Sequence, residues 1–186
     1  LRKGPIAASS SKFGGSSFIF SIPEDITVPV FDGIATFDDI KIYEGILLTS
    51  NFTFTSRNPN QKFILPNSGI DTNLINVMVK SNEQSTSRVK YLLQDNLLEI
   101  DSDSKIFFIQ EIEGERYEVF FGDGIFGHAL EEGNFITIDY ISSNGDAANG
   151  ASQFSFSGRL SYNRNGVEYT VTTGISLVTT ISPSSG

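Results

Sequence analysis

The chain has 186 residues, of which 39% are hydrophobic and 19% are charged, and its formal net charge at pH 7 is −9. The length predicts one folded domain or two small ones. The acidic balance argues against binding to a phosphate backbone, so we expect no nucleic-acid partner. No run approaches the ~18 apolar residues of a membrane helix, so no membrane partner is expected either. The lack of cysteine excludes disulfides, thiolate catalysis and cysteine-bound zinc.

The two ends of the chain have the composition of connecting segments. Residues 1–16 are predicted to be flexible, because small, polar and glycine residues dominate from residue 7 onward. Residues 183–186 have a linker composition, and the chain begins without Met. We therefore expect the chain to be an internal piece of a longer polypeptide. Between the ends, residues 17–182 are predicted to be a mainly β domain, or two subdomains with 44–121 as an inserted part.

Period-two apolar spacing dominates this central part and predicts short strands. In chain order, these strands are expected at residues 17–21, 27–31, 40–43, 46–55, 62–65, 74–80, 88–93, 105–111, 116–121, 134–141, 153–162, 167–171 and 175–181. Hairpins are expected between 74–80 and 88–93 and between 105–111 and 116–121. Single helical turns fit 37–40 and 91–98. The prediction is an all-β or mainly β fold, an antiparallel sandwich or barrel-like domain with short helical turns.

A glycine-rich corner follows the strand at 116–121. The letters Gly122-Asp123-Gly124-Ile125-Phe126-Gly127 satisfy the dinucleotide-binding pattern G-x-G-x-x-G. That site requires a helix after the last glycine, because the helix N-terminus holds the pyrophosphate. Here Gly133 and a β-patterned run follow too soon for a helix. We therefore expect positive φ angles at Gly122, Gly124 and Gly127, a side-chain bond from Asp123 to its own backbone, and no cofactor.

The residues that carry catalytic or metal chemistry are sparse. The sequence has one histidine, His128, and no Gly-x-Ser-x-Gly motif whose serine it could activate as a nucleophile. His128 is therefore expected to be an ordinary loop residue. Acidic residues at 38–39 and 101–103 lack the dense spacing of a calcium loop. Carboxylate pairs within 111–113 and 131–132 leave glycoside hydrolysis open, since their separation is invisible in the sequence. The prediction is no catalytic residue, no metal and no enzymatic activity.

Residues 117–141 resemble a family signature. They fit the pattern Y-x-x-x-F-G-D-G-x-x-G-x-x-L-x-x-G-N-x-I-x-I-x-Y of phage baseplate wedge proteins. The similarity is to the large wedge subunit of T-even-type contractile-tailed phages (gene product six family), which is related to the baseplate J-like proteins. Weaker matches extend it over roughly 18–182, and His128 stands where the family is expected to have Lys or another polar residue. The motif residues carried over, as a structural turn, are Gly122, Asp123, Gly124, Gly127, Gly133 and Asn134.

The resemblance implies an architectural function. Such a subunit assembles with other baseplate wedge proteins and with copies of itself, and transmits conformational change during host attachment and tail contraction. It implies a virion protein of the tail baseplate that is assembled in the host cytoplasm and has no known catalytic role. The alternative is a carbohydrate- or receptor-binding β-domain of a tail fibre or adhesin. An enzyme is the third hypothesis.

Overall fold

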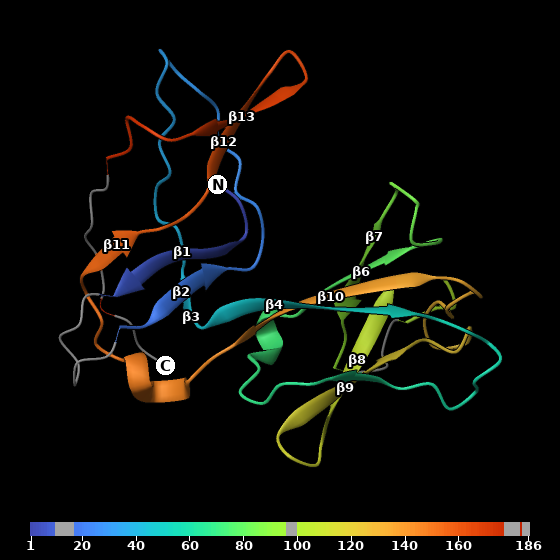
Figure 1. Cartoon of the computed structure of the whole chain (residues 1–186). Helices are drawn as coiled ribbons and strands as arrows, with labels where there is room; N and C mark the ends of the chain where they lie inside the picture. The colour runs from blue at the N-terminus through green and yellow to red at the C-terminus, as the bar shows by residue number, and fades with distance from the viewer. Residues whose placement is uncertain (10–16, 96–99, 177–182, 184–186) are drawn as a thin grey trace. The chain divides into compact units, whose positions relative to one another are not determined.

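The computed structural model describes residues 1–9, 17–95, 100–176 and 183 (Figure 1). Their regular secondary structure is almost entirely β-strand, which confirms the predicted mainly β fold class. The helices of the described part are single 3₁₀ turns, η1 (Thr72–Leu74) and η2 (Gly145–Ala148). None of its helices is long and apolar enough to cross a membrane.

The strands form a four-stranded sheet, a seven-stranded sheet and a two-stranded hairpin. In chain order they are β1 (Gly4–Ser9), β2 (Ile19–Ile22), β3 (Tyr43–Glu44), β4 (Ile46–Thr53), β5 (Phe63–Leu65), β6 (Asn76–Lys80), β7 (Val89–Leu93), β8 (Ile106–Ile112), β9 (Arg116–Phe121), β10 (Phe135–Ser142), β11 (Phe154–Phe156), β12 (Leu160–Arg164) and β13 (Val167–Val171). The described chain divides into two compact units. Unit 1 comprises Leu1–Leu47 and Ser143–Gly186, and unit 2 comprises Leu48–Ser142.

The inserted unit is longer than the sequence suggested. Its start at Leu48 lies close to the expected residue 44, but it ends at Ser142 and not at residue 121. The reason is strand β10, which pairs with β6 over five residues and so belongs to the inserted sheet. A strand pairing between distant segments leaves no local signal in the sequence.

Unit 1 is built on the sheet order β11-β1-β2-β3. Its core contains Leu1, Ile6, Ala7, Phe20, Ile22, Ala148 and Ala151. The prediction that residues 1–16 are flexible is wrong for residues 1–9, because β1 lies between β2 and β11 in this sheet. Leu1 is buried, and its ammonium group donates a hydrogen bond to the Ile26 carbonyl at 2.8 Å. Residues 10–16 lie outside the described part, as do 184–186 of the expected linker.

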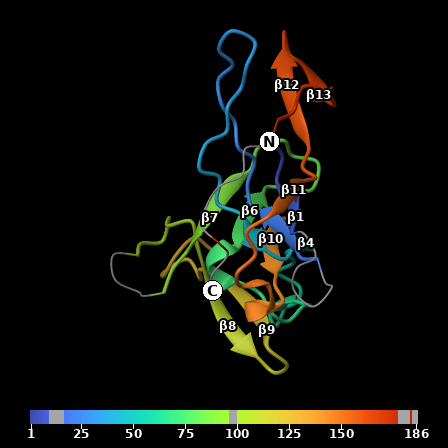
Figure 2. The same cartoon turned by 90° about the vertical axis from the view of Figure 1, so that its left-hand side faces the viewer.

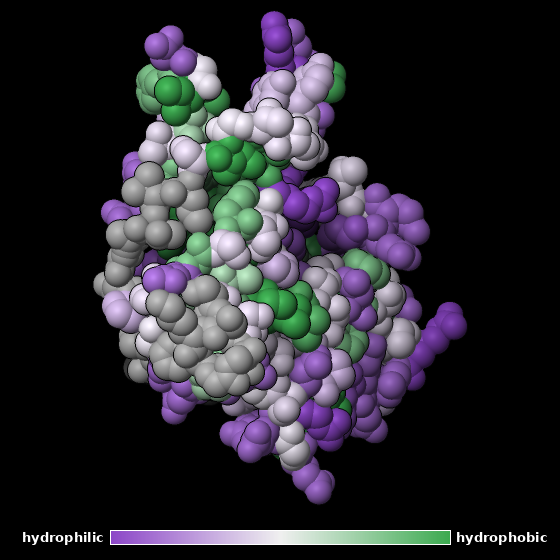
Figure 3. Space-filling model, turned by 60° about the vertical axis from the view of Figure 1, so that its left-hand side comes forward, coloured by the Kyte–Doolittle hydropathy of each residue, from purple (hydrophilic) through white to green (hydrophobic). Residues whose placement is uncertain are grey.

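Two arms project from the same end of the unit 1 sheet (Figure 2). One is the hairpin β12–β13, whose turn has Asn165 at φ 54° and Gly166 at φ 81°. The other is the loop 23–40, hereafter the acidic arm. Apolar and polar side chains mix on the surface of both arms (Figure 3).

The acidic arm ends in a two-residue turn. Phe31 and Ile34 exchange backbone hydrogen bonds of 2.8 Å, and Asp32 and Gly33 between them have φ angles of 47° and 77°. Asp-Gly is a residue pair typical of such a two-residue turn. The strand expected at 27–31 is absent except for this bridge, and so is the helical turn expected at 37–40. The strand expected at 175–181 lies mostly outside the described residues.

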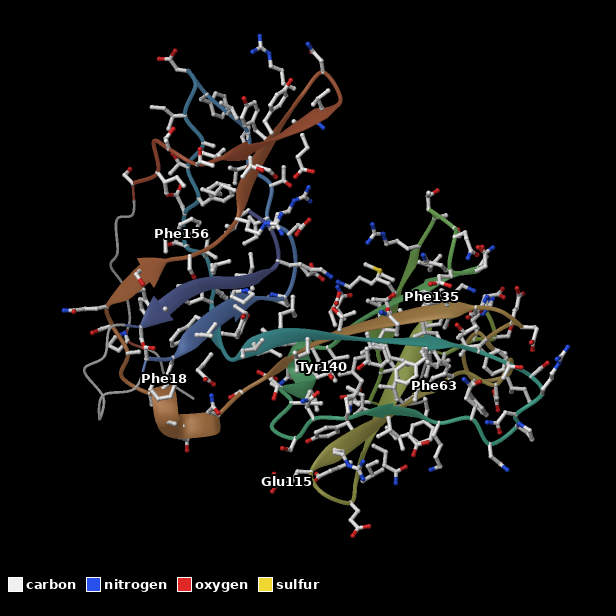
Figure 4. All side chains as sticks on the ribbon, viewed as in Figure 1. Phe18, Phe63, Glu115, Phe135, Tyr140 and Phe156 are labelled. Carbon is white, nitrogen blue, oxygen red and sulfur yellow. The ribbon has the colours of Figure 1, made fainter. Side chains whose placement is uncertain are left out.

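Unit 2 is a single curved sheet in the order β4-β10-β6-β7-β8-β9-β5, nearly closed into a barrel. Strands β7 and β8 are parallel, whereas β6–β7, β8–β9, β5–β9 and β6–β10 are antiparallel. The two edge strands approach each other, since the rings of Phe52 on β4 and Phe63 on β5 meet edge to face at 5.5 Å. Phe63 and Tyr140 lie inside the sheet, and Glu115 lies in the outer turn of β8–β9 (Figure 4).

Both hairpins predicted within this unit are confirmed. β6 pairs with β7, and β8 pairs with β9 through a turn that holds Gly114 at φ 80° and Glu115 at φ 55°. The helical turn expected at 91–98 is wrong for residues 91–93, which belong to β7, and residues 96–99 lie outside the described part. Alternating side chains from these strands fill the core, which includes Leu65, Val77, Phe107, Val119, Ile136, Ile138 and Tyr140.

Candidate functional site: the glycine corner

The glycine corner, residues 122–134, joins β9 to β10 in unit 2. It begins at Gly122, which forms a parallel bridge with Ala129. Gly122 does not have the positive φ that the sequence predicted. Its requirement is contact: a Cβ atom there would lie 2.2 Å from the Gly127 carbonyl carbon and 2.6 Å from its Cα. Two stretches of backbone touch at this point, so only glycine fits.

Asp123 closes the first turn of the corner. One of its carboxylate oxygens accepts hydrogen bonds from the backbone N–H of Phe126 at 2.8 Å and of Ile125 at 2.9 Å. These two bonds, that from Phe126 first, lower the pKa of Asp123 below its usual value. The predicted bond from this side chain to its own backbone is therefore present.

The other two glycines of the motif have the expected left-handed backbone. Gly124 and Gly127 have φ angles of 88° and 86°. The Gly124 N–H donates to the Gly127 carbonyl at 3.0 Å, which closes the turn. A Cβ atom on Gly127 would also come within 2.8 Å of Ile106 Cγ1. Gly127 therefore needs both its φ and its lack of a side chain.

The corner is bound to the loop that precedes β8. The Gly127 N–H donates to the Asp101 carbonyl at 2.9 Å, and the His128 N–H donates to the Ser104 carbonyl at 2.8 Å. The Asp101 carboxylate accepts from the Ser104 hydroxyl at 2.6 Å and from the Asp103 N–H at 3.1 Å. These bonds, that of the Ser104 hydroxyl first, lower the pKa of Asp101. The acidic loop 101–103 thus organises its own turn.

The second half of the corner is a tight turn before β10. Gly133 has a φ of 85°, and the buried Asn134 side chain accepts from the Glu131 N–H at 3.0 Å. Gly133 donates to the Phe54 carbonyl at 3.1 Å, and the Phe54 N–H donates to the Asn134 carbonyl at 2.8 Å. The turn therefore holds the chain that leaves β4.

A carboxylate adds to this connection. Glu132 accepts from the Ser56 N–H at 2.6 Å, the Ser56 hydroxyl at 2.7 Å and the Thr55 hydroxyl at 3.1 Å. The bonds from Ser56 are the main reason that the pKa of Glu132 lies below its usual value. The glycine corner therefore joins four segments: the ends of β4 and β9, the loop before β8, and the start of β10.

This geometry explains why the nucleotide pattern has another purpose here. A phosphate loop keeps several backbone N–H groups free to bind the anion. In the corner, the N–H groups of residues 124, 125, 126, 127 and 128 all donate to protein oxygens. The element that follows is β10, so no helix N-terminus faces the loop. The corner uses its glycines to build a fixed backbone.

The candidate chemical groups are placed as follows. The Nδ1 atom of His128 lies 3.4 Å from the Tyr91 hydroxyl, at the limit of a hydrogen bond. Burial raises the pKa of Tyr91, and Glu131 raises it further. Of the two carboxylate pairs, Glu111 lies on β8 with Glu113 just beyond its end, and Glu131 and Glu132 lie in the turn before β10. Within the described ranges, no three His, Asp or Glu side chains gather as metal ligands.

An open groove of about 420 Å³ lies beside the corner, within unit 2. We call it the phenylalanine groove. Its walls are residues 59–63 and 118–122, together with Phe54, Ala129 and Leu130. The Lys62 ammonium stands at its rim and donates to Glu118 at 2.9 Å; the Lys62 side chain is 61% exposed and that of Glu118 only 6%.

Two features of the site escaped the sequence reasoning. Ile125 and Phe126, at the outside of the corner, are 70% and 48% exposed. The half-buried pair of Lys62 and Glu118 joins a loop to strand β9 across 56 residues of sequence. The first feature has a signal, since a two-residue apolar stretch between positive-φ glycines has no strand to bury it. The second feature has no signal in the sequence, because the two residues of a long-range pair stand at no characteristic spacing.

The comparisons with known proteins assign no family. No protein-family model matches the chain, and no curated protein matches it.

Proposed function

We propose that this chain is a structural part of a baseplate wedge subunit of a contractile phage tail, acting through protein–protein assembly and the transmission of conformational change during host attachment and tail contraction. In this proposal it is a virion component that is assembled in the host cytoplasm. Its partners are other wedge proteins and further copies of itself, and it has no catalytic role.

The observation that carries the proposal is the glycine corner. The glycines and the aspartate shared with the wedge signature act on the backbone, through a close contact at Gly122, a side-chain turn at Asp123 and left-handed angles at Gly124, Gly127 and Gly133. A motif that fixes four segments relative to one another suits a structural subunit, whose fold must stay unchanged while it transmits a conformational change. The support is the agreement between the resemblance and this architectural use.

The exposed apolar surface gives further support. Single apolar side chains are common on protein surfaces, but groups of them mark interaction sites. Among the described residues, the most exposed large apolar side chains are Val30, Phe31, Ile34, Leu92 and Ile125, with exposed fractions of 59%, 75%, 68%, 60% and 70%. Three of the five lie within five residues of sequence, at the end of the acidic arm. Such a surface fits a subunit that buries it against partners.

The proposal is tested with the full-length protein and the neighbouring tail proteins of the same phage. Co-expression is expected to give a defined complex with fixed stoichiometry, whose interfaces bury ~2,000 Å² or more, as obligate assemblies do. Size-exclusion chromatography with light scattering and a structure of the complex measure both. A full-length protein that stays alone and hydrolyses a glycan or a peptide would contradict the proposal.

One observation favours the alternative of a carbohydrate- or receptor-binding domain. On the hairpin β12–β13, the Tyr162 and Tyr169 rings stack at 5.2 Å with an interplanar angle of 17°, and the residues are 45% and 44% exposed. A glycan array tests this directly. Binding that is lost in Tyr162→Ala would favour the alternative, whereas no binding to any glycan supports the assembly proposal.

A further inference from the structure

The acidic arm carries a rigid apolar tip. The tip consists of Val30, Phe31 and Ile34, and Phe31 is 75% exposed. The two backbone bonds between Phe31 and Ile34 and the left-handed pair at the turn hold it in one shape. A tip with fixed backbone loses little conformational freedom when it binds. It has the properties of a preformed docking element.

The arm that carries this tip is acidic, and one of its carboxylates lies in the tip turn. The arm, residues 23–40, contains five Asp or Glu residues and no Lys or Arg. Asp25 is paired with Arg2 at 2.7 Å near the base of the arm. Asp32 lies in the turn itself, directly between the apolar side chains of the tip. The chemistry that suits the tip is therefore an apolar recess with a positive charge at its rim.

The phenylalanine groove has this chemistry. Its lining includes four phenylalanines besides polar residues, and its volume of about 420 Å³ is open to solvent. Of these, Phe120 is 37% exposed, Phe54 and Phe121 are half-buried, and Phe63 at the bottom is only 6% exposed. The Lys62 ammonium at the rim uses one of its three N–H groups on Glu118. With 61% of its side chain exposed, it can donate to a second carboxylate.

We infer that the apolar tip of one molecule docks into the phenylalanine groove of a second copy, with Phe31 among the groove phenylalanines and Asp32 beside Lys62. The inference rests on the proposed function, in which copies of the protein associate, and it names one contact between those copies. The occupant is a second copy because the same chain carries both the convex apolar element and the concave one, and because Asp32 of the tip and the exposed Lys62 of the groove have opposite charges.

This contact has a definite symmetry. The tip and the groove are different surfaces, so each docked molecule leaves one tip and one groove free. Such a head-to-tail contact produces a closed ring when the rotation between copies closes and an open chain when it does not. An anionic lipid surface is a poorer match, because the carboxylates of the arm would face lipid headgroups of the same charge.

The cysteine-free sequence allows a direct test with the 186-residue chain. Val30→Cys places a thiol in the tip, next to Phe31, and Asn60→Cys places one on the groove wall. The two single-cysteine proteins, one labelled with nitrogen-15, are mixed at about 0.15 M salt, where charges are screened beyond ~8 Å. They are then briefly oxidised with copper phenanthroline and oxygen. Intact mass spectrometry separates the three possible disulfide-linked dimers.

Random pairing of equal amounts gives as much 30–60 dimer as the two symmetric dimers together. The expected result is a 30–60 dimer in roughly tenfold excess over the two symmetric dimers together, the factor that about 1.4 kcal/mol of docking produces. Phe31→Ser in the Val30→Cys protein should remove the excess. Phe126→Ser, at an exposed phenylalanine outside the groove walls, should leave it unchanged. Glu113→Cys, in an exposed turn of unit 2, should give only the statistical yield with Val30→Cys.

A statistical mixture of dimers would overturn the inference, and so would an excess of the symmetric 30–30 dimer. The same holds if phosphatidylserine vesicles bind the tip and no 30–60 dimer forms. The proposed function is judged separately, by co-purification of the full-length protein with its tail neighbours. If the 30–60 dimer shows no excess but the full-length protein still forms the tail complex, this contact alone is refuted. If the 30–60 excess is found but no tail complex forms, the wedge assignment alone is refuted.

Discussion

Replacement of Gly122 by alanine is the sharpest probe of the glycine corner. The backbone of Gly122 does not have a positive φ, so alanine causes no conformational penalty of that kind. The whole effect comes from the added methyl group, which would lie 2.2 Å, 2.3 Å and 2.6 Å from the carbonyl carbon, carbonyl oxygen and Cα of Gly127. All three are backbone atoms, so no side-chain rotation relieves the overlap.

The magnitude follows from what must move. Carbon atoms pack best at about 3.5–4.0 Å, so the corner has to open by more than ~1 Å. Opening endangers the Gly124 to Gly127 and Gly127 to Asp101 hydrogen bonds, of 3.0 Å and 2.9 Å. With about 1 kcal/mol for each bond and ~1–3 kcal/mol for overpacking, Gly122→Ala is expected to lower the unfolding free energy of unit 2 by about 3–5 kcal/mol.

Gly133→Ala is the matched control in the same corner. Gly133 has a φ of 85° and no atom within 4 Å of an added Cβ, so only the backbone penalty of about 1–2 kcal/mol applies. Gly124→Val, at a φ of 88°, should cost more than ~1 kcal/mol for the same reason. Urea titrations followed by far-UV circular dichroism and tyrosine fluorescence give the free energies. The reasoning fails if Gly122→Ala costs no more than Gly133→Ala.

Three further predictions concern side chains of unit 2. Lys62→Met should lower the unfolding free energy by about 1–3 kcal/mol, because the Glu118 side chain, 6% exposed, loses the ammonium at 2.9 Å; the double variant with Glu118→Met should recover most of this loss. Tyr140→Phe should cost about 1 kcal/mol in the same titration, because the hydroxyl donates to the Asn67 side chain at 2.7 Å. The pKa of Asp123 is lower in the folded protein than in the unfolded chain, so the unfolded chain binds more protons in this pH range. The ionised Asp123 carboxylate therefore stabilises the fold near neutral pH, and its contribution is lost as the pH falls below about 4. Asp123→Asn should therefore flatten the decline of the urea midpoint between about pH 5 and pH 3, and an unchanged decline would contradict this.

Much of the fold could be predicted because its signals are local. Alternation of apolar residues marked the strands of unit 2. The pairs Asp32-Gly33 and Asn165-Gly166 are typical of sharp reversals, and both have left-handed backbone. The pairing of β8 with β9 follows from one short turn. In each case the residues that decide the structure lie within about ten positions of one another, which is the range over which periodicity and turn chemistry act.

The failures come from pairings between distant segments. Residues 4–9 read as part of a flexible segment, yet β1 is ordered by β2 and by β11, which lies some 150 residues away. Residues 27–31 have strand composition but find no partner beyond the bridge at Phe31. The composition of a segment shows whether it is able to form a strand. Whether it does so depends on a partner strand that is available in the folded protein.

The glycine corner shows why motif spacing alone misleads about function. Tight reversals and phosphate loops both need glycines a few residues apart, because both bring backbone segments close together. What separates them is the state of the N–H groups. In this corner Asp123 takes two of them, at Ile125 and Phe126, and carbonyl oxygens take those of Gly124, Gly127 and the following residue. An acidic residue that accepts hydrogen bonds from the backbone of its own loop therefore indicates that the loop N–H groups are already used. The same glycine spacing with a neutral, non-capping residue at that position would leave these N–H groups free to bind a ligand.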